Sequence, residues 1–109
     1  MIGLLLLAAN VSTAPGFYNG ADLYRFCKQD PGGACLTYII GVSDEIDTLV
    51  QLGALSQPVC PPPKVTAAQE RDIVVRFLEQ TPEARNQSAA SLTMAAPQNA
   101  FPCAGQQPG

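Results

Sequence analysis

Hydrophobic residues recur with helical spacing through most of the chain. Between about residues 34 and 52, apolar side chains return at steps of three and four, at Cys35, Ile39, Val42, Ile46, Leu49 and Val50. This spacing places them on one face of an α-helix, because a helix completes a turn in about 3.6 residues. The pattern therefore predicts a long helix over residues 34–52.

A shorter helical segment precedes the long one. It begins at residues 19–22, and its apolar positions share one face, at Leu23, Phe26 and Cys27. The sequence Asp30-Pro31-Gly32-Gly33 then combines the residue types that favour a tight turn. We expect this turn to reverse the chain before the long helix begins.

Two further helices are predicted after a proline-rich stretch. Residues 57–63 cannot continue a helix, because proline lacks the N–H that helical hydrogen bonding needs, so they form a stiff extended linker. Thr66 and Gln69 then have the spacing of a capping box. The helix that they open buries a stripe made of Ile73, Phe77 and Leu78.

The last helix is expected to begin at Thr81-Pro82-Glu83. Thr81 suits the cap position, Pro82 the first helical position, and Glu83 supplies an acid in the first turn. We expect the helix to turn Ala89, Leu92 and Ala96 inward and to stop by Pro97. The predicted fold class is all-α, a compact bundle of about four helices.

The first residues are predicted to be a signal peptide. The apolar run from Met1 to Ala9 is about half as long as a membrane-spanning helix, and Ala14 and Gly16 offer small residues for cleavage before Phe17. No Lys or Arg precedes Arg25, unlike the usual signal peptide, so a start upstream of Met1 and a misassigned start both stay open. We expect residues 1–16 to be the signal peptide, 17–104 the helical domain and 105–109 a disordered tail. After cleavage we expect a periplasmic protein without a membrane segment.

Composition and charge exclude several classes of function. A chain of 109 residues allows one domain. A net charge of −3 excludes the basic surface of a nucleic-acid-binding protein. The chain has no His, so it lacks the commonest general base and the commonest metal ligand. We therefore expect neither an enzyme nor a protein that holds a metal or a cofactor.

The four cysteines, Cys27, Cys35, Cys60 and Cys103, predict two disulfides. An even number of cysteines in a small exported domain is typical of disulfides, which form in oxidising compartments. Zinc is the rival interpretation, but there is no Cys-x-x-Cys pair and no His to complete such a site. We therefore interpret the cysteines as structural.

Helix lengths predict how these cysteines pair. Cys27 and Cys35 face each other across the turn, and the long helix then carries the chain about 28 Å away from them. The next helix returns and the last one goes out again, which brings Cys103 to the side where Cys60 lies. The predicted pairs are Cys27–Cys35 and Cys60–Cys103.

Two features of the long helix suggest roles. Asp44, Glu45 and Asp47 form the densest charge cluster, and no basic residue lies between Lys28 and Lys64. The functional hypothesis is an acidic patch that meets a cationic partner surface; the alternative, which the pattern favours, is a solvated helix face. Gly41 costs about 1 kcal/mol relative to Ala in mid-helix, which predicts that another helix approaches it closely. The favoured interpretation is a helix of the same domain, and the alternative is a helix across a dimer interface.

Short motifs along residues 20–103 resemble the Rap/Tai immunity protein family. The most specific stretch is Ala34-Cys35-Leu36-x-Tyr38-Ile39-x-Gly41-Val42, and Ala100-Phe101-Pro102-Cys103 closes the resemblance. Between and before them lie Gly20-x-x-Leu23, Phe26-Cys27, Cys60 with Pro62, Thr66 with Gln69, and Val75-x-x-Leu78 before Pro82. Pro97 and the triple proline 61–63 depart from the usual family pattern.

The resemblance implies an exported bacterial protein linked to type VI secretion. Relatives of this kind are all-α, bind and block a secreted peptidoglycan amidase, and tend to act as homodimers. The expected partner is thus an amidase effector, bound by a rigid body that presents a loop or a helix face. The proline-rich loop 58–64 and the turn 81–85 are the candidate contact segments. The alternative is a periplasmic housekeeping protein of the same fold, such as a holdase that exposes apolar surface in acid.

Overall fold

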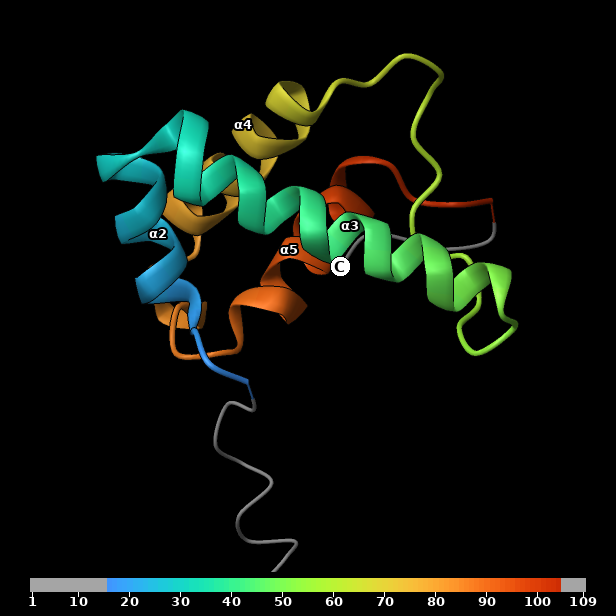
Figure 1. Ribbon diagram of the computed structural model, residues 1–109, viewed down its shortest axis with the longest axis horizontal. Coiled ribbons are helices and arrows are strands. Elements are labelled where there is room, and N and C mark those ends of the chain that lie inside the picture. Colours follow the sequence, from blue (N-terminus) through green and yellow to red (C-terminus); the bar gives the residue numbers. More distant parts are fainter. Residues whose placement is uncertain (1–15, 105–109) are drawn as a thin grey trace, which may run out of the picture.

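The computed structural model describes residues 16–104, and within that range the chain forms four α-helices and no sheet (Figure 1). The helices are α2 (Gly20–Gln29), α3 (Leu36–Gln51), α4 (Ala67–Gln80) and α5 (Ala89–Ala100). A π-helical turn, η1 (Pro31–Cys35), joins α2 to α3, and a 3-10 turn, η2 (Pro82–Ala84), follows α4. The predicted all-α bundle is confirmed. Apart from Gly16, the predicted signal peptide 1–16 lies outside the described residues, as does the predicted tail 105–109.

Helix α2 begins with a capping box. The Asn19 side chain accepts the N–H of Asp22 at 2.9 Å, and the Asp22 carboxylate accepts the N–H of Asn19 at 3.0 Å. This hydrogen bond from Asn19 lowers the pKa of the Asp22 carboxyl. The first turn of a helix has N–H groups without partners inside the helix, and these contacts satisfy two of them.

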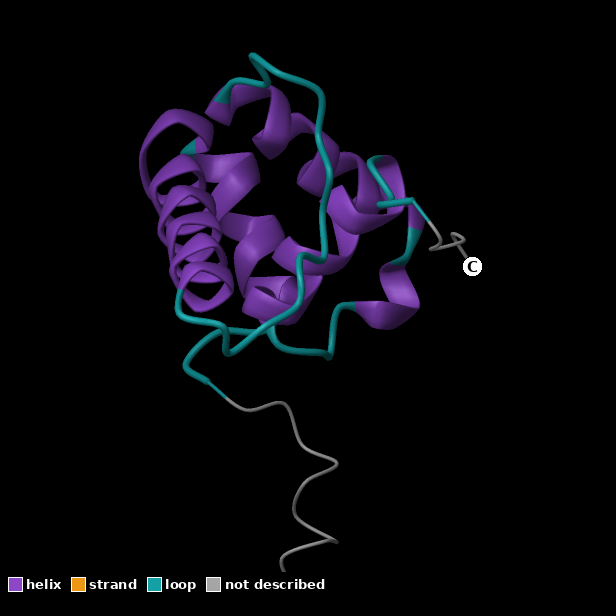
Figure 2. Ribbon diagram, turned by 90° about the vertical axis from the view of Figure 1, so that its right-hand side faces the viewer, coloured by secondary structure: helices purple, strands orange, loops and turns teal. Residues whose placement is uncertain are grey.

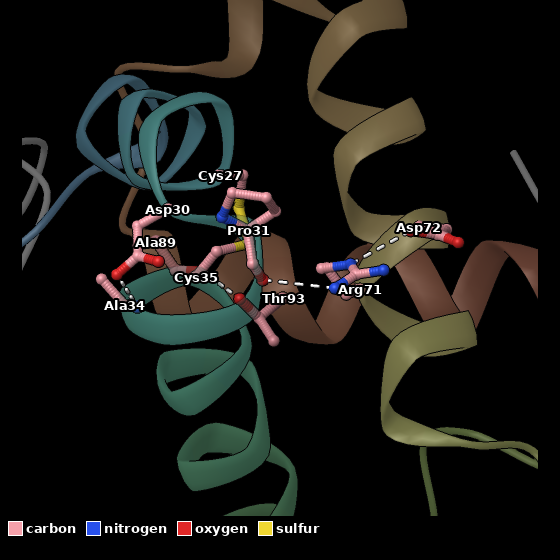
Figure 3. The surroundings of a disulfide bond; sticks show 9 residues. All are labelled: Cys27, Asp30, Pro31, Ala34, Cys35, Arg71, Asp72, Ala89 and Thr93. Atoms are coloured by element: carbon pink, nitrogen blue, oxygen red, sulfur yellow. Dashed lines mark hydrogen bonds and ion pairs between the residues drawn. A yellow bond between two sulfur atoms is a disulfide. The ribbon is translucent and has the colours of Figure 1, made fainter.

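The turn predicted at residues 30–33 is itself helical. The Asp30 carboxylate accepts the N–H of Ala34 at 2.9 Å, and the Asp30 carbonyl accepts the N–H of Cys35 at 3.2 Å. From α4, the guanidinium of Arg71 donates to the Pro31 carbonyl at 3.3 Å (Figure 3). The chain thus passes from α2 into α3 without an open loop.

The predicted disulfide Cys27–Cys35 lies at this turn and is confirmed, with its Cα atoms 4.6 Å apart. Both cysteines are buried. They belong to the core, whose other members are Leu23, Ile39, Val74, Leu78, Ala89, Leu92 and Ala96. The disulfide is therefore part of the packed interior.

Only the first half of α3 enters this core. Of the predicted stripe, Cys35 and Ile39 are buried, whereas Val42, Ile46, Leu49 and Val50 are partly buried. The second half of α3 extends to the other end of the bundle (Figure 1). A different surface, described below, forms there.

The prediction that the last helix begins at 81–83 is wrong. Pro82–Ala84 form a single 3-10 turn, and α5 begins only at Ala89, where the Ser88 hydroxyl caps it. The reason is tertiary: the carbonyls of Arg85 and Gln87 accept the N–H groups of Ala21 and Gly20, at 3.0 and 2.9 Å. These two hydrogen bonds hold residues 85–88 against the first turn of α2 in a non-helical conformation, and α5 begins after them.

The prediction that Pro97 stops the last helix is also wrong, because α5 continues to Ala100. Proline removes one N–H donor, but its carbonyl still accepts the N–H of Phe101 at 2.7 Å. Pro97 is also buried, so its ring gains packing contacts that offset part of this loss.

The predicted close approach at Gly41 is not found. A Cβ built on Gly41 would have no heavy atom of another segment within 4 Å, whereas a Cβ on Gly20 would lie 2.9 Å from the Arg85 Cα. The glycine that a close approach requires is Gly20, where the segment 85–88 crosses the start of α2. Gly41 instead faces open space on α3.

None of the helices within residues 16–104 has the length and hydropathy that crossing a bilayer requires.

Candidate partner-binding surface

The end of the molecule opposite the Cys27–Cys35 bridge is built from the second half of α3 and the segment that follows it. Helix α3 ends where Gly53 adopts a left-handed φ of 78°, and the N–H of Ala54 reaches back to the Leu49 carbonyl at 2.9 Å. This is a usual helix ending, because glycine enters that region without steric cost. The chain is then free to cross the end of the bundle.

Residues 57–65, here called the proline loop, run across this end of the bundle (Figure 2). The loop is clasped to the segment after α5 by the disulfide Cys60–Cys103, with Cα atoms 4.9 Å apart, which confirms the predicted pair. The N–H of Cys60 also donates to the Phe101 carbonyl at 2.9 Å. Cys60 and the residues 61–64 are exposed, so this disulfide lies at the surface.

A cavity of ≈ 130 Å³ lies beneath the proline loop. Four segments form its walls: α3, the loop, the first turn of α4, and α5 with the residue after it. Its apolar lining consists of Ile46, Val59, Pro61, Val65, Met94, Pro97 and Phe101. Its polar lining consists of Ser43, Asp47, Gln57, Glu70 and Thr93.

The cavity carries two acidic side chains and no basic one. Asp47 comes from α3 and Glu70 from α4, and the Ser43 hydroxyl donates a hydrogen bond to Oε1 of Glu70. Among the ion pairs within residues 16–104, none involves Asp47 or Glu70. The cavity therefore combines apolar walls with uncompensated negative charge.

The predicted acidic cluster is divided by this geometry. Asp44, Glu45 and Asp47 are all exposed, but only Asp47 lines the cavity. The hypothesis that the three acids meet a partner stays a prediction. The structure adds that they occupy unequal positions, because one of them borders an apolar cavity and the other two do not.

The turn 81–85, the second candidate contact segment, is largely occupied by contacts inside the domain. The guanidinium of Arg85 lies 4.1 Å from the centre of the Tyr24 ring, and its Nε donates to the Leu78 carbonyl at 2.8 Å. Pro82 and Glu83 remain exposed. This turn therefore joins α4 and α5 to α2 more than it presents a free surface.

Some residues of the cavity carry no sequence signal and others do. Nothing in the sequence shows that Glu70 faces α3 rather than solvent. Thr93 does carry a sequence signal, because it interrupts the apolar stripe of α5 between Ala89 and Ala96. In the structure Thr93 is buried, and its hydroxyl donates to the Ala89 carbonyl at 2.8 Å. A polar residue on a buried stripe marks a place where the interior is not uniformly apolar.

Within the described part of the chain, no three His, Cys, Asp or Glu side chains gather closely enough to hold a metal ion. All four cysteines are in disulfides. Two disulfides in a small domain fit a protein of an oxidising, extracytoplasmic compartment.

The family model of the Rap1a immunity proteins matches residues 19–103. No curated protein and no solved structure matches the chain. The matched range contains all four described helices, both disulfides and every residue that lines the cavity.

Proposed function

This chain belongs to the Rap1a immunity proteins, and from that premise we propose that it is exported to the periplasm and there occludes a secreted peptidoglycan amidase of type VI secretion. Membership of an immunity family implies a protein partner, an effector, and such proteins generally act by binding rather than by catalysis. The match over residues 19–103 is the observation that carries the proposal.

The proposed mechanism is steric occlusion by a preorganised surface. The proline loop holds three consecutive prolines, and a disulfide and a backbone hydrogen bond at Cys60 tie it to the segment after α5. A loop that is already ordered loses less conformational entropy when it binds, which raises its affinity. The loop end of the molecule is thus our candidate for the surface that covers the amidase active site.

Export is supported by the two disulfides, which form and persist in the periplasm and not in a reducing cytosol.

The sequence resembles immunity proteins that act as homodimers, and we therefore propose that this protein also forms a homodimer. Light scattering on the purified, oxidised protein tests this: a mass near twice that of one chain is expected, and a single-chain mass at micromolar concentration contradicts it.

The direct test of the proposed function pairs this protein with the product of the gene next to its own. The oxidised protein is titrated calorimetrically into that neighbour, and release of fragments from purified peptidoglycan is measured in parallel. We expect nanomolar affinity and loss of hydrolysis at one equivalent. An unrelated peptidoglycan amidase, which must stay active, serves as the control. Absence of binding, or binding that leaves hydrolysis intact, contradicts the proposal.

A further inference from the structure

We propose that the cavity beneath the proline loop receives one lysine or arginine side chain of the protein partner. The identity of that partner rests on the proposed function, but the chemistry of the cavity is testable without the partner.

The size of the cavity fits a side chain better than a cofactor. Its volume of ≈ 130 Å³ is below the roughly 300–1,000 Å³ of typical small-molecule sites. Its walls hold aliphatic and aromatic groups, among them Ile46, Val59, Val65, Met94 and Phe101. Such walls suit the methylene stem of a long side chain, which gains free energy when it leaves water.

The charge of the cavity selects the head group of that side chain. Asp47 and Glu70 approach it from two different helices, and neither forms an ion pair within residues 16–104. Two carboxylates beside an apolar wall favour a cation, because a positive charge compensates their negative charge and strengthens association. An acidic side chain of a partner would be repelled there.

The basic residue next to Glu70 in the sequence and the one in the proline loop do not supply this cation. Arg71, next to Glu70 in sequence, donates to Asp72 at 3.1 Å and to the Pro31 carbonyl at 3.3 Å. Lys64 is exposed in the proline loop and is not among the residues that line the cavity. The negative charge is therefore left for an incoming group.

The carboxylate of Glu70 is already oriented for such a contact. The Ser43 hydroxyl donates to Oε1, and Oε2 has no hydrogen-bond donor among the described residues. The Cys60–Cys103 bridge ties the loop, in which Cys60 stands between Val59 and Pro61, to the segment after α5 that adds Phe101 to the lining. The site is thus formed before the partner arrives, which is the condition for a specific contact.

The neighbouring acids provide a matched comparison. Asp44 lies three residues before Asp47 on the same exposed side of α3 but does not line the cavity. If the acidic cluster acts only through its overall electrostatic field, Asp44→Asn and Asp47→Asn weaken cation binding equally. If the cavity binds a cation, only Asp47→Asn weakens binding strongly.

The test is a nuclear magnetic resonance titration of the full oxidised protein with n-butylammonium and n-propylguanidinium, which mimic the lysine and arginine side chains. Butan-1-ol is the uncharged control. We expect shifts at Val59, Val65 and Met94, and about tenfold weaker binding of both cations by Asp47→Asn and by Glu70→Gln. Asp44→Asn should bind them as the wild type does. Unchanged thermal unfolding of each variant shows that the fold is retained.

Three outcomes overturn the inference: no shift at the cavity residues, equal weakening by Asp44→Asn and Asp47→Asn, or butan-1-ol binding as tightly as the cations. When the effector is in hand, Asp47→Asn must weaken its binding by about tenfold and Asp44→Asn by less than about threefold. Equal losses with the effector refute the cavity contact and leave the proposed function intact. An effector that the wild type does not bind refutes the proposed function, and the titration with the small cations still decides the chemistry of the cavity.

Discussion

The two ends of this bundle are closed by disulfides that work in opposite ways. Cys27–Cys35 spans eight residues, is buried in the core and closes a turn that is already helical and hydrogen-bonded. Cys60–Cys103 spans 43 residues, lies at the surface and holds an extended loop over a cavity. The first end is fixed by packing and local hydrogen bonds. At the second end, a long-range disulfide and the hydrogen bond from Cys60 to the Phe101 carbonyl tie the loop to the segment after α5.

We interpret this difference as a division of roles, with the packed end providing stability and the loop end proposed for recognition. At the packed end, the side chains of both cysteines, Leu23 and Ile39 are withdrawn from solvent and unavailable to a partner. At the loop end, exposed backbone and uncompensated carboxylates are held in place without being buried. Binding surfaces commonly sit on ordered loops that a rigid scaffold positions, and only the second end has that character.

The largest expected effect comes from opening the loop end. Replacing Cys60 and Cys103 together by Ala removes a link that closes 43 residues, which in the chain-entropy model contributes about 4 kcal/mol to the free energy of unfolding. Urea unfolding followed by circular dichroism measures the loss. Mild reduction of the wild type, followed by alkylation and mass spectrometry, is the complementary experiment: the pair Cys60–Cys103, in which Cys60 is exposed, should be labelled before the buried pair Cys27–Cys35. Labelling in the reverse order would contradict the distinction between the two ends.

The second effect tests the packing where segment 85–88 crosses α2. Gly20→Ala places a Cβ 2.9 Å from the Arg85 Cα, so we expect a destabilisation of about 1–3 kcal/mol from overpacking. Gly41→Ala is the matched control, because a Cβ there meets nothing within 4 Å, and it should stabilise the protein by about 0.5–1 kcal/mol. Thermal unfolding of both variants measures the difference. Destabilisation by Gly41→Ala would show that α3 is not open at that point.

The third effect concerns the helix that leaves the proline loop. The Thr66 side chain accepts the N–H of Gln69 at 3.1 Å and caps α4. Thr66→Ala should cost about 1 kcal/mol of unfolding free energy, because it leaves that donor without a protein partner. Thr66→Ser keeps the hydroxyl and is the matched control. Equal losses in both variants, measured by urea unfolding, would mean that the methyl group and not the cap is responsible.

The smallest effect is a difference in acid sensitivity between the two capping boxes. The Asn19 N–H lowers the pKa of Asp22 below its ordinary value of 3.8, and Arg25 adds a smaller contribution. A carboxyl whose pKa is lowered by folding stabilises the protein above its unfolded pKa, and this stabilisation disappears as the pH falls through the folded pKa. In the box of α4 the corresponding residue is Gln69, which does not titrate.

Asp22→Asn should therefore reduce the loss of stability between about pH 4 and pH 2. Glu83→Gln removes one exposed acid that belongs to neither capping box and serves as the control. Midpoints of urea unfolding across this range measure both. If the two variants have the same pH dependence, the capping box of α2 does not contribute to acid sensitivity.

The sequence predicted the features that follow from local periodicity and from helix length. The stripe of α3, the capping box at Thr66 and both disulfide pairs were all predicted, because a long helix fixes which cysteines lie near each other. The start of α5 was not predicted, because it depends on contacts with α2. There the N–H groups of Gly20 and Ala21 donate to the carbonyls of Gln87 and Arg85. No local propensity of residues 81–88 contains that information.

The cavity shows the same limit. The sequence identified the acidic cluster on α3 but gave no reason to separate Asp47 from Asp44 and Glu45. That separation depends on which face of α4 packs against α3, and hence on whether Glu70 points inward or outward. Gly41 shows a different kind of error. The close approach of a neighbouring segment that was predicted at Gly41 is found instead at Gly20, a glycine of another helix.

We propose that the partner binds the loop end and leaves the packed end free. Hydrogen–deuterium exchange of the oxidised protein, alone and with the effector, tests this most directly. We expect slower exchange in the second half of α3 and at the proline loop amides of Val59, Cys60, Lys64 and Val65, with no change at residues 20–35. Slower exchange at residues 20–35, with the proline loop unchanged, would contradict it.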